Sequence, residues 1–429
     1  MNTWQMRRTF PQDMKHRLIA FWLATAVGFL WTGCLPQASC ADKAAPQAKK
    51  VYCFEQPGVS FSNGFSGARL NDCVQLESNR FRVVIRPENT PINNSAWYAF
   101  KVTSDREQTI TVQLTYENGT HRYRPKVSHD GLRWKPLDPD AYETGPKKKE
   151  VTLQLKVGPD PLWVAGQEMI GVHELNEWLD GIAKLPFAKK SLLGRSVEGL
   201  PIYKLELTEA AEPENVMIIG RQHPPEVTGS IGLMAFVETL TRDDELARQF
   251  RAAFRAIVVP LVNPDGVEHG HWRHSVNGVD LNRDWGPFAQ PETRAVRDEI
   301  LQLRTKDIGR SLYLFVDFHS THRDVFYTQR DDQETFPKDF AANWLTAVGK
   351  RASGHSIRRV GVSGSKPTSQ RWVYRTLGAA TITYELGDNT DREQIRRVAT
   401  ISAEEMMRLL LLARQNASVP TRVETSPSD

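Results

Sequence analysis

Four short apolar runs in the second half of the chain constrain its fold more than any other feature. They are residues 216–219, 256–262, 312–316 and 379–383. Strands that are apolar on both faces are typical of parallel sheets covered by helices on each side. The stretches between the runs have a helical pattern. We therefore expect an α/β domain over residues 163–416, built on a mixed, largely parallel sheet.

The preceding part of the chain has a shorter, alternating pattern. Period-two runs occur at residues 81–85, 97–102, 109–116 and 151–157. Turn signals such as Asn118-Gly119 separate them. Short alternating strands with such turns predict a small antiparallel β-sandwich, over residues 51–162. This stretch contains no evident catalytic constellation.

The N-terminal 41 residues resemble a secretory signal. A basic start at residues 14–17 precedes the apolar run 18–31, and small residues at 39–41 offer a cleavage site. The apolar run is shorter than the ~20 residues that a membrane span requires. We expect cleavage and export to the periplasm or the medium, with an uncleaved anchor as an alternative. Lipid attachment at Cys34, which follows Gly33, is a second alternative.

Two further segments flank the predicted domains. Residues 42–50 are polar and rich in Pro and Ala, so we expect a flexible lead. Residues 417–429 have the composition of a disordered tail.

Charge limits the partners that this chain can have. Residues 1–41 contain four basic residues and one acidic residue, so their removal lowers the net charge from +4 to +1 (51 basic, 50 acidic). Such a near-neutral chain lacks the electrostatic footprint of a nucleic-acid-binding protein. We expect no nucleic-acid partner and no stable membrane span after cleavage.

Two of the four cysteines, Cys53 and Cys73, lie outside the signal segment. An even pair in an exported protein predicts one disulfide. Two reduced thiols are the alternative.

A metal site is indicated where the run 216–219 ends. His223 and Glu226 follow it at a spacing of three, in a turn stiffened by two prolines. Ligands at the carboxyl end of a strand can converge on one ion. A His-x-x-Glu pair alone is a weak signal, because a catalytic zinc normally has three protein ligands. His319, at the end of another apolar run, is favoured as the third over His322, which lies further into a loop.

Six motifs in order resemble the carboxypeptidase A-like zinc metallocarboxypeptidase family. They are His-x-x-Glu from His223, Asn-Pro-Asp-Gly from Asn263, an arginine at 273, Asp-x-Asn-Arg from Asp280, the strand-end His319 and the late Glu385. They cover about residues 165–415. Within the family, the β-rich N-terminal part and the Asp-Leu-Asn-Arg-x-Trp segment are most similar to the cytosolic carboxypeptidase branch.

The resemblance implies a role for each matching residue. His223, Glu226 and His319 match the ligands of one Zn²⁺, and Glu385 matches the general base. Arg273 matches the arginine that polarises the scissile carbonyl. Asn282 and Arg283 match the pair that binds the terminal carboxylate of the substrate. The chemistry agrees, because a planar guanidinium binds a carboxylate through two hydrogen bonds.

The side-chain pocket departs from the digestive members of the family. Residues 361–369 lack the usual mobile tyrosine, and Tyr374 is the nearest. Gln370 and Arg371, which would line the pocket, match neither the apolar nor the acidic pattern. If Arg371, Arg375 and Lys366 face inward, the pocket favours an acidic C-terminal residue.

The sequence thus predicts a zinc metallocarboxypeptidase acting on the C-terminus of peptides or proteins. One alternative is a cell-wall peptidase that cuts γ-D-glutamyl-diaminopimelate bonds, since Arg283 could hold that free carboxylate too. Deacylation of N-acyl amino acids is a third reaction, which the Asn-Pro-Asp-Gly segment disfavours. The non-enzymatic alternative is an inactive binding module with a carboxypeptidase fold. That alternative is disfavoured because ligands and base are all present.

Overall fold

The computed structural model describes residues 44, 46–303, 312–362 and 364–418, which belong to one compact unit. The predicted signal segment, residues 1–41, lies outside the described residues. So does most of the predicted tail, because helix α8 (Arg392–Ser418) includes residues 417 and 418. No helix within the described ranges has both the length and the apolar character needed to cross a bilayer.

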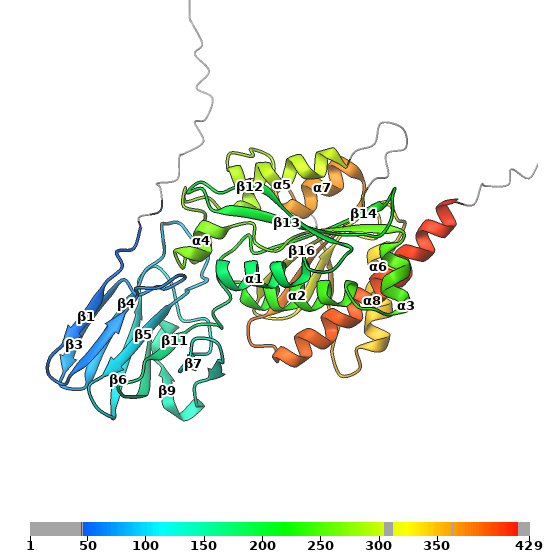
Figure 1. Cartoon of the computed structure of the whole chain (residues 1–429). Helices are drawn as coiled ribbons and strands as arrows, with labels where there is room; N and C mark the ends of the chain where they lie inside the picture. Colours follow the sequence, from blue (N-terminus) through cyan, green and yellow to red (C-terminus); the bar gives the residue numbers. More distant parts are fainter. Residues whose placement is uncertain (1–43, 45, 304–311, 363, 419–429) are drawn as a thin grey trace, which may run out of the picture. The chain divides into compact units, whose positions relative to one another are not determined.

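Two β-sheets form the N-terminal part (Figure 1). The strands of the first, in spatial order, are β1 (Val51–Phe54), β2 (Val59–Ser62), β5 (Ala99–Ser104), β11 (Leu162–Ala165), β7 (Lys126–Ser128) and β8 (Lys135–Pro136). Those of the second are β3 (Asp72–Glu77), β4 (Arg80–Ile85), β6 (Gln108–Tyr116), β10 (Glu150–Val157) and β9 (Tyr142–Thr144). Two 3₁₀ turns, η1 (Pro139–Ala141) and η2 (Pro146–Lys148), flank β9.

The predicted antiparallel sandwich is confirmed, with one parallel pair, β4 and β6. Strand β6 shows why the alternating pattern predicts it: Ile110, Val112 and Leu114 are buried while their neighbours are not. Residues two apart in a strand share a face, so one face enters the core. Strand β11 continues the sandwich to Ala165, a few residues past the predicted boundary.

The C-terminal part is built on one mixed sheet. Its strands, in spatial order, are β12 (Ala188–Arg195), β13 (Pro201–Leu207), β15 (Phe254–Val259), β14 (Glu214–Gly220), β16 (Leu312–Thr321), β19 (Ala380–Gly387), β17 (Val325–Thr328) and β18 (Arg359–Gly361). The central strands β15, β14, β16 and β19 are parallel. Antiparallel pairs join β12 to β13, β13 to β15 and β17 to β19.

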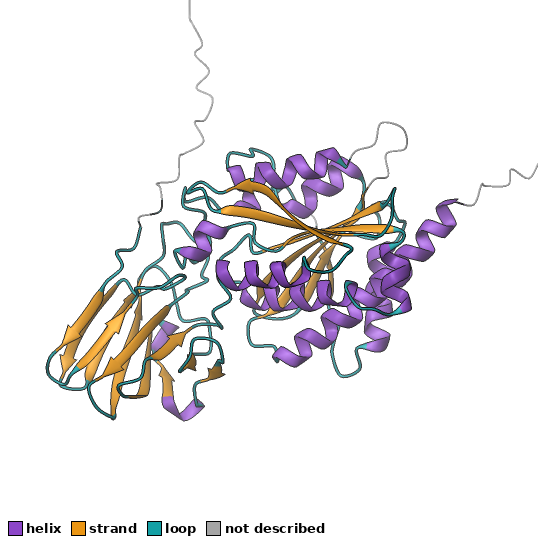
Figure 2. Ribbon diagram, in the orientation of Figure 1, coloured by secondary structure: helices purple, strands orange, loops and turns teal. Residues whose placement is uncertain are grey.

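Helices cover both faces of this sheet (Figure 2). The helices of the α/β part before α8 are α1 (Val172–Ile182), α2 (Val227–Leu240), α3 (Glu245–Arg251), α4 (Pro264–Glu268), η3 (Leu281–Arg283), α5 (Pro291–Gln302), α6 (Phe340–Arg351) and α7 (Ser369–Leu377). On β14, Val216 and Ile218 pack into one core, with α2, α6 and α8. Met217 and Ile219 pack into another, with α5 and α7. The predicted helix-covered, largely parallel sheet is confirmed.

The predicted Cys53–Cys73 disulfide is not formed, and both residues are free thiols. Cys53 is exposed on β1 and Cys73 is buried on β3. These strands belong to different sheets. Burial raises the pKa of the Cys73 thiol, which keeps it protonated. An even cysteine count does not specify on which face of which sheet each thiol lies.

The segment predicted as a flexible lead is bound to the sandwich where it is described. The side chain of Asn63 accepts a hydrogen bond from Lys50 N (2.6 Å) and donates one to Ala48 O (3.0 Å). Gln47 Oε1 accepts from Leu70 N at 3.0 Å. Backbone groups that find such partners become ordered, which composition alone does not show.

Candidate metal centre and active site

The turn between β14 and α2 presents the first two predicted ligands. Arg221, in a left-handed conformation (φ 56°), fixes this turn from within. Its guanidinium donates to Pro224 O (2.8 and 3.0 Å), to Ile170 O (2.9 Å) and to Ser230 Oγ (2.9 Å). The arginine thereby supplies the donors that hold His223 and Glu226 at the end of the strand.

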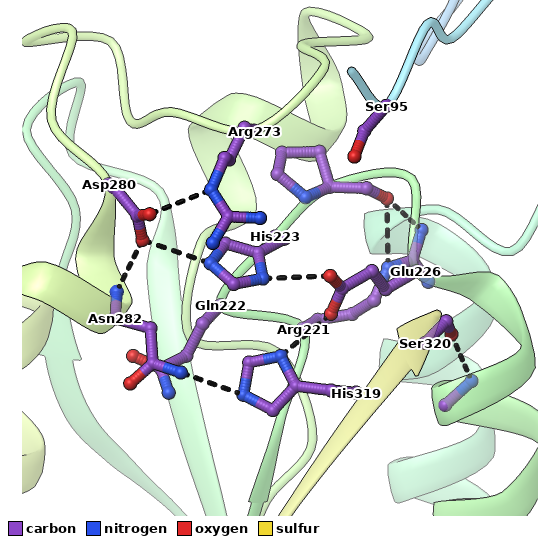
Figure 3. Close-up of polar contacts among 12 residues, drawn as sticks. Ser95, Arg221, Gln222, His223, Glu226, Arg273, Asp280, Asn282, His319 and Ser320 are labelled. Carbon is purple, nitrogen blue, oxygen red and sulfur yellow. Dashed lines mark hydrogen bonds and ion pairs between the residues drawn. The ribbon is translucent and has the colours of Figure 1, made fainter. Parts of the chain in front are cut away.

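Three side chains converge in Figure 3. The Glu226 carboxylate lies 2.8 Å from His223 Nδ1 through Oε1 and 2.8 Å from His319 Nδ1 through Oε2. Candidate ligand atoms of all three residues lie within 4.8 Å of one another, and all three are buried. Two imidazoles and one carboxylate make a typical zinc ligand set. His322, the rival third ligand, lies outside this group and is exposed.

Each imidazole has a carboxylate beside its other nitrogen as well. Asp280 Oδ1 lies 3.0 Å from His223 Nε2, and Asp317 Oδ2 lies 2.9 Å from His319 Nε2. A neutral imidazole has one N–H and cannot donate to carboxylates on both sides. With Nε2–H donating to the aspartate, each Nδ1 keeps a lone pair that a cation can accept. The donor set therefore fits a Zn²⁺ ion between the rings and Glu226.

The sequence motifs assign no functional role to Asp280 or Asp317. Both lie inside or beside the motifs that were noticed, since Asp280 begins Asp-x-Asn-Arg and Asp317 stands two residues before His319. Despite burial, the hydrogen bond from His223 and the charges of Arg273 and Arg283 hold the pKa of Asp280 well below its ordinary value. Asp280 is thus a carboxylate that can orient His223.

Glu385 lies beside the third ligand. Strands β16 and β19 are parallel neighbours, and their register places Glu385 opposite His319. Its Oε2 atom is buried and has no hydrogen-bond partner among the described residues. Burial raises the pKa of Glu385 to about 7; Glu226 acts in the same direction and His319 against it. A carboxylate with a free oxygen and such a pKa is suited to accept and return a proton.

The predicted substrate residues line the same cleft, which has a volume of about 670 Å³. Arg273 Nε donates to Asp280 Oδ2 at 2.7 Å. Arg283 donates to Asn282 O at 2.7 Å through one nitrogen of its guanidinium. Asn282 Oδ1 accepts from Ser369 N at 3.0 Å, so its amide packs between α7 and the ligands. The structure brings all three together beside the convergent histidines.

Three of the predicted pocket residues, Gln370, Arg371 and Lys366, line the cleft, and Arg375 does not. Gln370 donates to Tyr327 O and Thr381 O, both at 3.1 Å, so its amide mainly holds α7 on the sheet. Arg371 and Lys366 line the cleft. Arg375 and Tyr374 line a neighbouring hollow of about 250 Å³ that also includes Arg371. Arg375 is therefore outside the main cleft, contrary to the inward arrangement considered from the sequence.

The sandwich also contributes to the cleft. Asn93, Ser95 and Arg122 line it together with the α/β residues. Arg122 forms a buried two-point ion pair with Asp388, with N–O distances of 2.8 and 3.2 Å. The same side chain donates to Ser95 Oγ at 2.8 Å. No sequence signal points to these residues, because they lie in loops of a domain without a catalytic motif.

Comparisons with known proteins agree with this geometry. A family model described as zinc carboxypeptidase matches residues 175–405. The chain is 31% identical over 285 residues to cytosolic carboxypeptidase 6 of Homo sapiens (61% of this chain, 56% of that protein). It is 28% identical over 252 residues to an uncharacterized protein of Zymomonas mobilis (56% of this chain, 64% of that protein). The chain thus spans less than two thirds of the length of these relatives.

Solved structures share the fold over more of the chain. A metallo-carboxypeptidase from Burkholderia cenocepacia superposes with a TM-score of 0.67 at 23% identity, covering 83% of this chain and 99% of that one. A metallo-carboxypeptidase from Pseudomonas aeruginosa, in complex with (2-guanidinoethylmercapto)succinic acid, gives a TM-score of 0.66 at 19% identity, covering 82% and 98%. At 23% and 19% identity, these similarities show that the fold is shared and nothing more.

Proposed function

The chain belongs to the zinc carboxypeptidase family, and on that premise we propose that it is a zinc-dependent metallocarboxypeptidase that hydrolyses the C-terminal peptide bond of peptides or proteins. One observation carries the proposal: two Nδ1 atoms and a carboxylate converge beside a Glu385 oxygen that has no partner among the described residues, in a cleft that Arg273 and Arg283 also line. An inactive binding module would not need this arrangement.

His223, Glu226 and His319 would hold one Zn²⁺, which supplies Lewis-acid polarisation of a carbonyl and lowers the pKa of water. Arg283 binds the terminal carboxylate of the substrate and so places the last peptide bond in the cleft. Arg273 donates to the carbonyl oxygen as it becomes negatively charged. A fixed cation at this place stabilises the transition state more than the bound substrate.

Glu385 performs the proton transfer. Its Oε2 accepts a proton from the attacking water and returns it to the nitrogen of the leaving amine. Asp280 contacts both His223 and Arg273, through separate oxygens, at 3.0 and 2.7 Å. The Asp280 carboxylate thereby couples the orientation of His223 to that of the Arg273 guanidinium.

An acidic C-terminal residue is the substrate preference that the cleft supports. Arg371 and Lys366 line it from the α7 side. The NH1 atom of Arg371 is buried without a hydrogen-bond partner among the described residues. A carboxylate side chain of the substrate would supply that partner. The basic start and apolar run of residues 1–41 support export to the periplasm or the medium as the location.

The first test is a mass-spectrometric assay on a library of peptides that vary in the last residue, supplied as free acids and as C-terminal amides, with a muropeptide fraction alongside. The zinc-loaded protein should release the last residue of free acids only, and glutamate fastest. Release of diaminopimelate from muropeptides in place of ordinary residues would favour the cell-wall peptidase. Preference for apolar residues would contradict a basic pocket that binds an acidic side chain.

Arg283→Ala should lower kcat/KM on free acids by about 100-fold, because a charge-assisted bidentate contact contributes about 3 kcal/mol. Arg297→Ala, on α5 and outside the cleft-lining residues, is the matched control and should leave the rate unchanged. An Arg283→Ala variant that still cuts free acids at the full rate would show that this side chain does not bind the terminal carboxylate.

A further inference from the structure

The loop that carries Arg273 is bound by one carboxylate of the sandwich. Glu88 lies between β4 and β5 and is 4% exposed. Its Oε2 accepts from Trp272 N at 2.7 Å, and its Oε1 accepts from Arg273 N at 2.9 Å and from His274 N at 2.7 Å. Three consecutive backbone N–H groups of the α/β part therefore share one side chain that lies some 185 residues away in sequence.

Neighbouring contacts hold the same loop against the sandwich. Trp272 is fully buried and donates from Nε1 to Trp97 O at 3.1 Å. A Cβ atom added at Gly119 would overlap the Trp272 ring, so the ring packs directly on the sandwich backbone. Asn89 Oδ1 lies 2.6 Å from His274 Nδ1. The loop thus has little freedom to shift away from Glu88.

Glu88 is ionised in this setting. Burial disfavours the charged form, but the charge of Arg69 and the backbone N–H groups of Trp272 and His274 favour it, and the pKa of Glu88 is lowered. An ionised carboxylate accepts hydrogen bonds about twice as strong as those between neutral groups. The loop is therefore held by three charge-assisted bonds.

Arg273 is consequently fixed at both ends. Glu88 binds its backbone N–H, and Asp280 binds its guanidinium at 2.7 Å. We propose that Glu88 is a positioning residue for the reaction, through which the sandwich domain holds the arginine that stabilises the transition state. This inference rests on the proposed function. It gives the sandwich a specific task, because a cation displaced by about 1 Å can lose much of its effect on the rate.

Glu88→Gln tests the proposal with little change of volume. The amide keeps one acceptor oxygen, but its NH₂ group replaces the other. That group faces a backbone N–H, to which it cannot form a hydrogen bond. We expect kcat to fall about tenfold or more with KM changed less than about twofold, since Arg273 acts mainly on the transition state. Zinc content should stay the same.

A double-mutant comparison separates positioning from general stability. In the Arg273→Ala background, Glu88→Gln should change kcat by less than about twofold, because the two residues act as one unit. Val83→Ala is the matched control: it truncates a buried residue of adjacent β4, so it should lower stability and leave kcat of the folded protein unchanged. An equal loss of kcat in both backgrounds would overturn the proposal.

Hydrogen exchange provides a readout that does not depend on activity. Glu88→Gln should speed exchange at the amides of residues 272–274 and leave β14 and β16 unchanged, whereas Val83→Ala should not act on this loop. Unchanged exchange at 272–274 would also overturn the proposal. A wild-type protein that cuts no peptide would contradict the proposed function instead, and the exchange data would still decide whether Glu88 holds the loop.

Discussion

The core of the sandwich and the cleft end of the α/β sheet bury opposite kinds of side chain. In the sandwich, Phe61 packs against Phe81 and Phe100 with ring centroids 5.1 and 6.0 Å apart. At the cleft, Glu226 is buried and Asp280 is partly buried, beside imidazoles and an arginine. Apolar burial stabilises a fold directly, whereas buried charges require partners to offset desolvation. The sandwich core therefore stabilises the fold, whereas the cleft contains charged groups whose burial costs stability and which are suited to chemistry.

The largest expected effect is at the cleft. Glu385→Gln should lower kcat by about 10³-fold, since the amide cannot accept the proton. The free energy of unfolding should stay the same or rise, because the change removes a buried carboxylate oxygen that has no partner among the described residues. Steady-state kinetics and thermal unfolding of the same samples check both. A variant that keeps its activity but unfolds more easily would show that Glu385 stabilises the fold and is not the general base.

In the sandwich, by contrast, we expect a substitution to lower stability and to leave activity unchanged. Phe81→Ala removes a fully buried ring and should lower the free energy of unfolding by about 3–5 kcal/mol, while the folded protein keeps its kcat. Denaturant titration measures the change. Val74→Ala, an exposed apolar residue on neighbouring β3, should change stability by less than about 0.5 kcal/mol. Equal effects of the two substitutions would mean that the ring cluster is not a stabilising core.

A smaller effect is expected at Glu292, a buried carboxylate of the α/β part outside the cleft. Its Oε1 accepts from Val197 N at 3.0 Å, and its Oε2 has no partner among the described residues. Burial raises its pKa from 4.5 to about 7. The folded protein therefore holds this proton more tightly, so the stability that it contributes is full below pH 4.5 and is lost as the pH rises to about 7.

Glu292→Gln should remove this loss of stability at higher pH, because an amide does not ionise. The variant should be more stable than the wild type at pH 8, by on the order of 1–3 kcal/mol, and nearly equal to it at pH 4.5. Thermal unfolding at both pH values measures the difference. Glu117→Gln, which alters an exposed ion pair with Arg86, is the control and should show little change at either pH. A stability difference that is the same at both pH values would rule out the titration of Glu292 as its cause.

The main elements of the fold were predictable because they have local signals. The apolar run 216–219 became β14, and residues on it alternate between two cores, which is why the run has no polar face. The turn Asn263-Pro264-Asp265-Gly266 was only partly predictable. The side chain of Asn263 accepts from Gly266 N at 3.0 Å and starts the short helix α4 instead of a simple turn.

The candidate site was predictable in part for a similar reason. His223 and Glu226 are neighbours in sequence, and His319 and Glu385 each follow an apolar run. Parallel strands place such residues at the same edge of a sheet. The cysteine pairing was wrong because sequence spacing does not fix which sheet or face each thiol occupies.

The two types of sheet, the family and the residues available for the chemistry follow from the amino-acid sequence. The groups that support those residues became identifiable only in the folded chain. Asp280 and Asp317 orient the histidines, Arg122 reaches the cleft from the sandwich, and Glu88 holds the loop of Arg273. Asp317 stands two residues before His319 on β16, but the other groups are distant in sequence from the residues that they contact. The contacts of Arg122 and Glu88 depend on how the sandwich packs on the α/β part, and no local periodicity encodes them.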